Sequence, residues 1–222
     1  GEFGALPDHD RRTHGQDNPD QDYERYLLTG HYLFGEGGSF IANWCWKDMD
    51  DVVFPWGINH TCGGPPKDIL KAYRNQSLLM RQIRPVYKPP AVFLVVPLDR
   101  MMGGGSGDRI RSVYGAIDSM LDARIDLGVI DDRHVSLLPS SSKAVTYEPG
   151  FRVPDELLRS DCRVGASAGH AFRIPEFGGG RAIILVNPKP EAQAATVLEG
   201  TVPLEVTLAP NGVGLVRYDA SG

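Results

Sequence analysis

The apolar run Ala91-Val92-Phe93-Leu94-Val95-Val96 constrains the fold of this chain more than any other feature. A continuous run of this length is typical of a strand that is covered on both faces. A glycine-rich loop over 103–107 follows it, and then an amphipathic helix over 109–127, for which Gly128 is the expected stop. We expect the next strand over 134–138. Strand, helix and strand of these lengths predict a parallel βαβ unit with a right-handed crossover.

Periodicity on either side of this unit predicts two further helices and four further strands. The helices are expected over 22–34 and 67–83, and the strands over 39–46, 182–186, 202–208 and 213–218. The strand over 202–208 alternates apolar and polar residues, as a half-buried antiparallel strand does. Pro210-Asn211-Gly212 predicts a turn before the last strand. The sequence therefore predicts a mixed α/β chain.

Composition excludes several classes of protein. The 222 residues are 41% hydrophobic and 23% charged with a net charge of −5, which favours a folded core and disfavours a general nucleic-acid binder. The longest apolar run, over 91–98, is far shorter than the ~20 residues that cross a bilayer. Three cysteines exclude a disulfide-built scaffold, and their spacing to histidine predicts no metal site. We expect no cofactor and no membrane partner, and no signal pattern opens the chain to indicate a compartment.

Several short segments resemble a known enzyme family when they are taken in order. They are Glu2-Phe3-Gly4, Asn43-Trp44-Cys45-Trp46-Lys47-Asp48, Phe54-Pro55-Trp56-Gly57-Ile58, Gly63-Gly64-Pro65-Pro66-Lys67 and Ala72-Tyr73-Arg74. This order resembles the last third of a clan A glycoside hydrolase, whose catalytic domain is a (β/α)8 barrel. The seventh strand of that barrel ends in a nucleophilic glutamate, and the eighth ends in a tryptophan that forms the floor of the sugar site.

The resemblance implies a role for five residues. Glu2 would be the nucleophile of a retaining glycosidase, and Trp46 would stack on a sugar ring. Trp44 shares a strand face with Trp46 and is a second candidate for substrate contact, although we favour ordinary core packing for it. Trp56 is a further candidate platform. Asp48 could hydrogen-bond sugar hydroxyls, and a solvated loop is the alternative for it.

The order of segments is also similar to that of family 42 β-galactosidases and their relatives. Residues 1–88 would be the end of a barrel, 89–176 a small flavodoxin-like α/β domain, and 177–222 a small antiparallel β-sandwich. A whole barrel needs about 250 residues. The acid/base glutamate of the clan usually follows an asparagine, and no Asn-Glu dipeptide occurs in this sequence. We therefore expect a retaining glycoside hydrolase that acts on carbohydrate, or a C-terminal fragment of one whose acid/base carboxylate lies elsewhere. We also expect self-association through exposed strand edges.

Two other functions stay open. Gly165-Ala166-Ser167-Ala168-Gly169 matches the nucleophile elbow of serine hydrolases, with Ser167 as nucleophile and His170 as its neighbour. His170 is the only histidine after Ser167, so the order Ser, acid, His of α/β-hydrolases is not available. The second alternative is a non-catalytic module for oligomerisation or carbohydrate binding.

Overall fold

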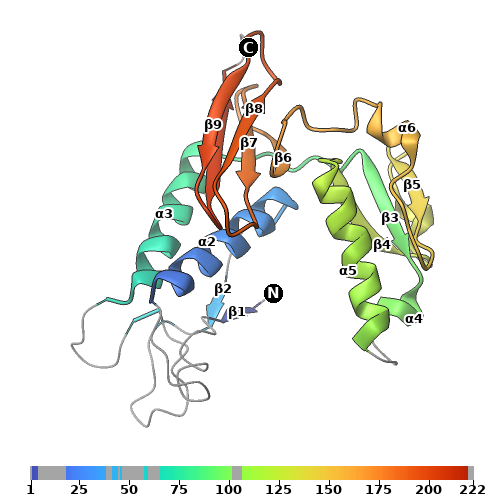
Figure 1. Cartoon of the computed structure of the whole chain (residues 1–222), viewed down its shortest axis with the longest axis horizontal. Helices are drawn as coiled ribbons and strands as arrows, with labels where there is room; N and C mark the ends of the chain where they lie inside the picture. The colour runs from blue at the N-terminus through green and yellow to red at the C-terminus, as the bar shows by residue number, and fades with distance from the viewer. Residues whose placement is uncertain are drawn as a thin grey trace.

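Among the described residues, the fold combines a three-stranded parallel sheet and a parallel strand pair with two antiparallel sheets and helices, which is the mixed α/β arrangement that the sequence predicts (Figure 1). We describe it from a computed structural model. The structure describes residues 2–4, 19–38, 42–44, 46, 58–59, 66–101 and 107–219. Its α-helices are α2 (Pro19–Gly35), α3 (Asp68–Ile83), α4 (Leu98–Met101), α5 (Gly107–Asp122) and α6 (Asp155–Leu158). Its strands are β1 (Glu2–Gly4), β2 (Ala42–Trp44), β3 (Val92–Val96), β4 (Leu127–Asp131), β5 (Lys143–Thr146), β6 (His170–Pro175), β7 (Arg181–Val186), β8 (Gln193–Val197), β9 (Leu204–Leu208) and β10 (Val213–Tyr218).

The predicted βαβ unit is present. Strand β3 is the centre of a three-stranded sheet with the order β4-β3-β5, and it is parallel to both neighbours. Val92, Leu94 and Val96 belong to the same buried cluster as Val113 and Met120 of α5. Alternate residues of β3 therefore pack against the helix, which Figure 1 shows alongside the sheet.

The end of this unit differs from the prediction. Helix α5 ends at Asp122 instead of continuing to residue 127, because Arg124 adopts a left-handed conformation with φ of 59°. The following strand is β4 and not residues 134–138, which contain a short 3-10 helix, Val135–Leu137. Gly128 lies inside β4 and does not end the helix. A Cβ there would lie 2.7 Å from the Phe93 ring, so the glycine is required by close packing.

Strand β7 is the most buried strand of the described chain, and each of its faces packs against a different layer. It lies between β6 and β10 in an antiparallel sheet of order β10-β7-β6. Ile184 packs in the cluster that contains Phe34 of α2, whereas Ile183 and Leu185 pack with Val197 of β8 and other residues of the β8–β9 pair. This alternation makes β7 the middle of a sandwich between a helix and a second, two-stranded sheet.

The last turn is present, but it joins strands of two different sheets. Asn211 has φ of 48° and Gly212 donates a backbone hydrogen bond to Ala209. Strand β9 pairs with β8, and β10 pairs with β7. Strand β6 belongs to the same sheet as β7, so this sheet extends across the boundary expected at residue 176. The division into units at residues 88 and 176 stays a prediction.

Helices α2 and α3 form a pair, and α2 packs against the antiparallel sheet (Figure 1). Gln76 of α3 is buried, and its side-chain amide donates hydrogen bonds to the carbonyl oxygens of Tyr26 and Leu27 on α2. A Cβ on Gly30 would overlap this amide. The helices predicted over 22–34 and 67–83 are thus confirmed, and glycine allows their close approach.

Candidate functional site

The two strands that carry the Glu-Phe-Gly and Asn-Trp segments lie side by side. β1 is parallel to β2, with Glu2 opposite Ala42 and Gly4 opposite Trp44. Neighbouring strands lie about 4.8 Å apart. Trp44 therefore lies two residues along β2 from the residue opposite Glu2, although some forty positions of sequence separate the two strands.

Trp46 lies just beyond β2 and is held through its backbone. Its carbonyl oxygen accepts hydrogen bonds from the backbone N–H of Asn59 at 3.1 Å and from the Asn59 side-chain amide at 3.2 Å. The neighbouring Ile58 is fully buried in a cluster with Tyr26 and Ile69. This packing anchors the segment whose Asn59 binds the Trp46 backbone. The Trp46 residue is 62% exposed. Its ring is thus accessible at a fixed point of the backbone, as stacking on a ligand requires.

The other predicted residues of this site are not placed by the structure. Asp48 and Trp56 lie outside the described residues. For Glu2 and Trp44 the structure describes the strand pairing alone. Their roles stay predictions.

The segment around Ser167 does not adopt the strand–turn–helix geometry of a nucleophile elbow. Strand β6 begins three residues after Ser167, where the elbow would need a helix. The backbone N–H of Ser167 donates to the Thr196 carbonyl at 3.0 Å, and the Ser167 hydroxyl oxygen accepts from the Thr196 N–H at 2.8 Å. Ser167 therefore pairs with the edge of β8. Its role as a nucleophile stays a prediction that this geometry does not favour.

His170 is buried and is held by two helices. Its Nδ1 lies 2.6 Å from the hydroxyl of Tyr32 on α2, and its Nε2 lies 3.1 Å from a carboxylate oxygen of Asp122 on α5. Burial and the negative charges of Asp118, Asp122 and Glu36 raise the pKa of the Tyr32 hydroxyl. Both ring nitrogens are thus engaged, and within the described part of the chain no hydrogen bond joins His170 to Ser167. Periodicity could not have indicated this cluster, because its members come from three distant segments.

A hollow lies between the end of α2 and the linker that precedes β3. Glu36 and Asp126 line it, together with the linker residues around Tyr87 and with Arg173 of β6. Burial, and then the charge of Asp126, raises the pKa of Glu36 to about 7. Glu36 keeps access to solvent at the rim of the hollow. Burial also raises the pKa of Asp126, against the opposing effect of its hydrogen bond from Ala91 N–H.

Arg173, which lines the hollow at Glu36, forms an ion pair with Glu199. Arg173 donates to the Glu199 carboxylate from Nε at 2.8 Å and from Nη2 at 2.6 Å, and the Gly165 N–H donates to the same group. Burial by itself would raise the pKa of Glu199, but the hydrogen bonds from Arg173 and Gly165 and the charges of Arg173 and Arg181 outweigh it. The pKa of Glu199 is therefore lowered.

Metal-ligand clusters and membrane-spanning helices are both absent from the described residues. They contain no cluster of three or more His, Cys, Asp or Glu side chains that could hold a metal ion. None of the described helices has both the length and the apolar character that crossing a membrane requires.

Comparison with known proteins finds similarity to glycoside hydrolases of known structure. No family model and no curated protein matches the chain. The crystal structure of GH5_18 from Streptomyces cattleya in complex with GlcNAc is 16% identical, with a TM-score of 0.47, and the match covers 65% of this chain and 37% of that one. The apo exo-carrageenase GH42 from Bacteroides ovatus is 8% identical, with a TM-score of 0.49, and the match covers 91% and 39%. This chain spans less than two fifths of either structure, and at these identities and TM-scores neither assigns a function to it.

Proposed function

We propose that this chain is part of a retaining glycoside hydrolase, with Glu2 as the nucleophile and Trp46 as a sugar platform. The observation that supports the proposal is the parallel pairing of β1 with β2. Two segments that resemble consecutive strands of one barrel are adjacent in space, in the parallel orientation that a barrel needs. The exposed Trp46 follows directly after the second of these strands.

The chemistry assigned to Glu2 is nucleophilic substitution at the anomeric carbon. An oxygen of the Glu2 carboxylate forms a bond to this carbon while the bond to the leaving-group oxygen breaks, and the leaving group takes the electron pair. A second carboxylic acid, outside these 222 residues, would protonate the leaving group of a natural substrate. Water then attacks the glycosyl-enzyme and restores the carboxylate.

The test uses a substrate that does not need the second carboxylic acid. A panel of 2,4-dinitrophenyl 2-deoxy-2-fluoroglycosides provides a leaving group that departs without protonation, and the fluorine slows hydrolysis of the glycosyl-enzyme. We expect the intact mass of the chain to increase by one fluoroglycosyl group, with the label on the peptide that contains Glu2. Glu2→Gln should abolish labelling, and Glu205→Gln, at an exposed position of β9, should retain it.

Labelling that persists in Glu2→Gln would contradict the proposal, and so would the absence of labelling across the panel. The platform role is tested by Trp46→Ala, which should slow labelling at low glycoside concentration because ring stacking is lost. Tyr114→Ala removes another exposed aromatic ring, on α5, and should leave the labelling rate unchanged. Equal rates for the two variants would rule out a contact between Trp46 and the sugar.

A further inference from the structure

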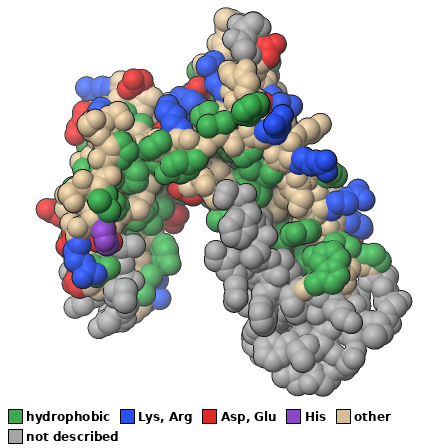
Figure 2. Space-filling view, turned by 180° about the vertical axis from the view of Figure 1, so that it is seen from behind, with side chains coloured by type: hydrophobic (Ala, Val, Ile, Leu, Met, Phe, Trp, Pro, Cys, Tyr) green, Lys and Arg blue, Asp and Glu red, His purple; other side chains and the backbone are tan. Residues whose placement is uncertain are grey.

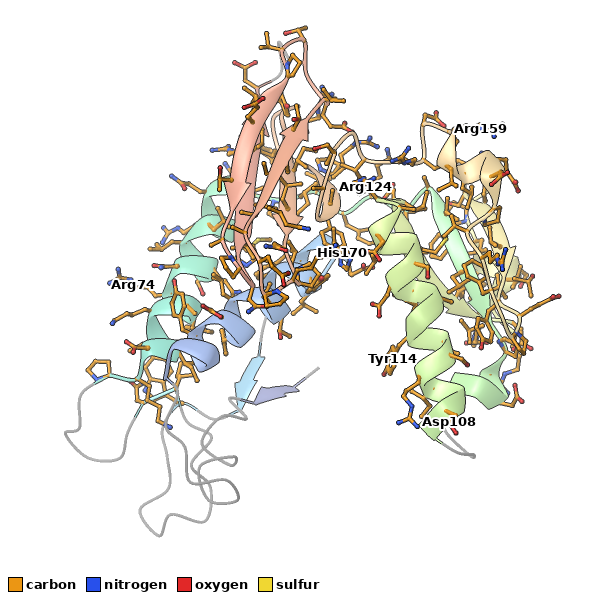
Figure 3. The ribbon with its side chains drawn as sticks, viewed as in Figure 1. Arg74, Asp108, Tyr114, Arg124, Arg159 and His170 are labelled. Atoms are coloured by element: carbon orange, nitrogen blue, oxygen red, sulfur yellow. The ribbon has the colours of Figure 1, made fainter. Side chains whose placement is uncertain are left out.

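A polar hollow lies where the end of α5 meets the antiparallel strands. We call it the Arg124 hollow; its volume is about 290 Å³, and its polar lining is Asp122, Arg124, Ser167, His170, Lys189 and Gln193. Figure 3 shows Arg124 and His170 near each other at this junction, whereas Arg74 lies on α3, away from it. The hollow is separate from the β1–β2 pair and from the residues assigned to glycosidase chemistry.

Arg124 lines this hollow from an unusual backbone conformation. Arg124 has a left-handed φ of 59°, and its main chain is tied by hydrogen bonds to Leu121 and Val164. Its Nε is buried and has no acceptor among the described residues. A buried donor without an acceptor is costly, and a non-glycine residue in this conformation is strained. An acceptor brought by a ligand would satisfy the donor.

The charges around the hollow favour an anion. Lys189 is exposed and forms no ion pair with a described acidic residue, while its backbone is fixed by the Asn187 side chain at 3.1 Å. The carboxylate of Asp122 is turned toward His170. The lining therefore contains two cationic residues, Arg124 and Lys189, and one carboxylate, which already has a partner.

The lining of the hollow also contains an acceptor. The side-chain oxygen of Gln193 is buried and receives no hydrogen bond from the described residues. A ligand that satisfies both Arg124 and Gln193 must carry an acceptor with negative charge and also a donor. Phosphate at neutral pH has both, because its monoanion and dianion keep at least one O–H group, whereas sulfate has no O–H group.

We propose that the Arg124 hollow binds an oxyanion that also carries a hydroxyl group. Inorganic phosphate is the smallest such ligand. A phosphorylated sugar is a larger one, in which the phosphate supplies the anionic oxygens and the sugar supplies the hydroxyl group. Arg124 Nε and Lys189 hold the anionic oxygens, and the Gln193 oxygen accepts from the hydroxyl. His170 and Ser167 also line the hollow, and their existing hydrogen bonds stay in place.

The experiment is calorimetric titration of the whole chain with sodium phosphate, sodium sulfate and glucose 6-phosphate at constant ionic strength. We expect phosphate to bind more tightly than sulfate. Arg124→Gln should weaken phosphate binding about tenfold or more, because one charge-assisted hydrogen bond is lost. Lys189→Gln changes an exposed side chain, retains the fold and should weaken binding severalfold. Arg74→Gln, at an exposed position of α3, should have no effect.

Tighter binding of glucose 6-phosphate than of phosphate would identify a phosphorylated sugar as the ligand. Binding of phosphate without binding of glucose 6-phosphate would identify the free ion. No binding of phosphate or glucose 6-phosphate would overturn the proposal. Phosphate binding that is equal in the wild type, Lys189→Gln and Arg124→Gln would do the same. Sulfate binding as tight as phosphate binding would overturn the part assigned to Gln193.

Discussion

The hydroxyl of Tyr32 on α2 lies 2.6 Å from Nδ1 of His170 on β6, across 138 positions of sequence. The same imidazole contacts Asp122 at the end of α5, and the two aromatic rings meet edge to face with centroids 5.7 Å apart. One buried side chain thus connects the α2–α3 pair, the antiparallel sheet and the helix of the parallel unit. Figure 2 shows hydrophobic side chains around the junction of these parts on the face that it presents.

Tyr32→Phe should destabilise the chain by about 1–3 kcal/mol, because Nδ1 of the buried His170 loses its partner while the ring packing is retained. Urea unfolding followed by circular dichroism measures this change. The matched control is Tyr114→Phe, which removes the hydroxyl of a tyrosine that is 60% exposed, and it should leave the midpoint unchanged. Equal midpoints for the two variants would show that the Tyr32–His170 contact adds no stability.

Glu36 should make the protein less stable as the pH rises from about 4.5 to about 7. The pKa of Glu36 in the folded chain is raised to about 7, so the folded state binds its proton more tightly than the unfolded state does. Its contribution to stability is complete below the ordinary pKa and is lost as the pH rises through the raised pKa. Asp126 acts in the same direction, because its pKa is also raised.

Unfolding midpoints at closely spaced pH values test this dependence. Glu36→Gln is neutral at every pH and should flatten the decline, whereas Glu205→Gln on β9 should leave it as in the wild type. An unchanged slope in Glu36→Gln would mean that the carboxyl titrates alike in both states.

Glu199→Gln should cost about 3 kcal/mol, the usual effect of removing one partner from a buried ion pair. The Glu199 side chain is 10% exposed and its partner Arg173 is 25% exposed, so water replaces little of the lost interaction. The pKa of Glu199 is lowered in the folded chain, so its contribution is complete above its ordinary pKa and is lost as the pH falls. Thermal unfolding at neutral and acid pH should therefore show a difference from the wild type that shrinks at acid pH.

Asp108→Asn breaks an ion pair whose two side chains are each at least 75% exposed, and it provides the control for the buried pair. We expect almost no change in stability at any pH, because solvent screens exposed pairs. A loss as large as that of Glu199→Gln would contradict the importance of burial.

Gly128→Ala should destabilise the parallel sheet by roughly 1–3 kcal/mol, because the new methyl group would meet the Phe93 ring and Pro90. Gly115→Ala places a methyl group on α5 with no atom within 4 Å. The latter should stabilise the chain by roughly 0.5–1 kcal/mol through helix propensity. Opposite shifts in the urea midpoint are expected, and shifts of the same sign would contradict one of the two placements.

The sequence by itself determined the elements whose signal is local. The apolar run of β3 and the amphipathic patterns of α2, α3 and α5 are repeated over one segment, so burial of one face is visible before any partner is known. The turn at Asn211-Gly212 is equally local. The sequence also singles out Glu2-Phe3-Gly4 and Asn43-Trp44 through their resemblance to barrel strands, and the structure pairs the two segments in parallel.

Tertiary structure decided the remaining features, because their physical cause lies in distant residues. Strands β5, β6 and β8 form by pairing with neighbours, and their own sequences contain no long apolar run, so they carry little local signal. Helix α5 ends where Arg124 turns left-handed, and no glycine marks that point. His170 follows an elbow-like motif, yet its neighbours are Tyr32 and Asp122, from two helices. Only the packing of those helices against the sheet brings the buried polar atoms of Arg124 and Gln193 to one hollow.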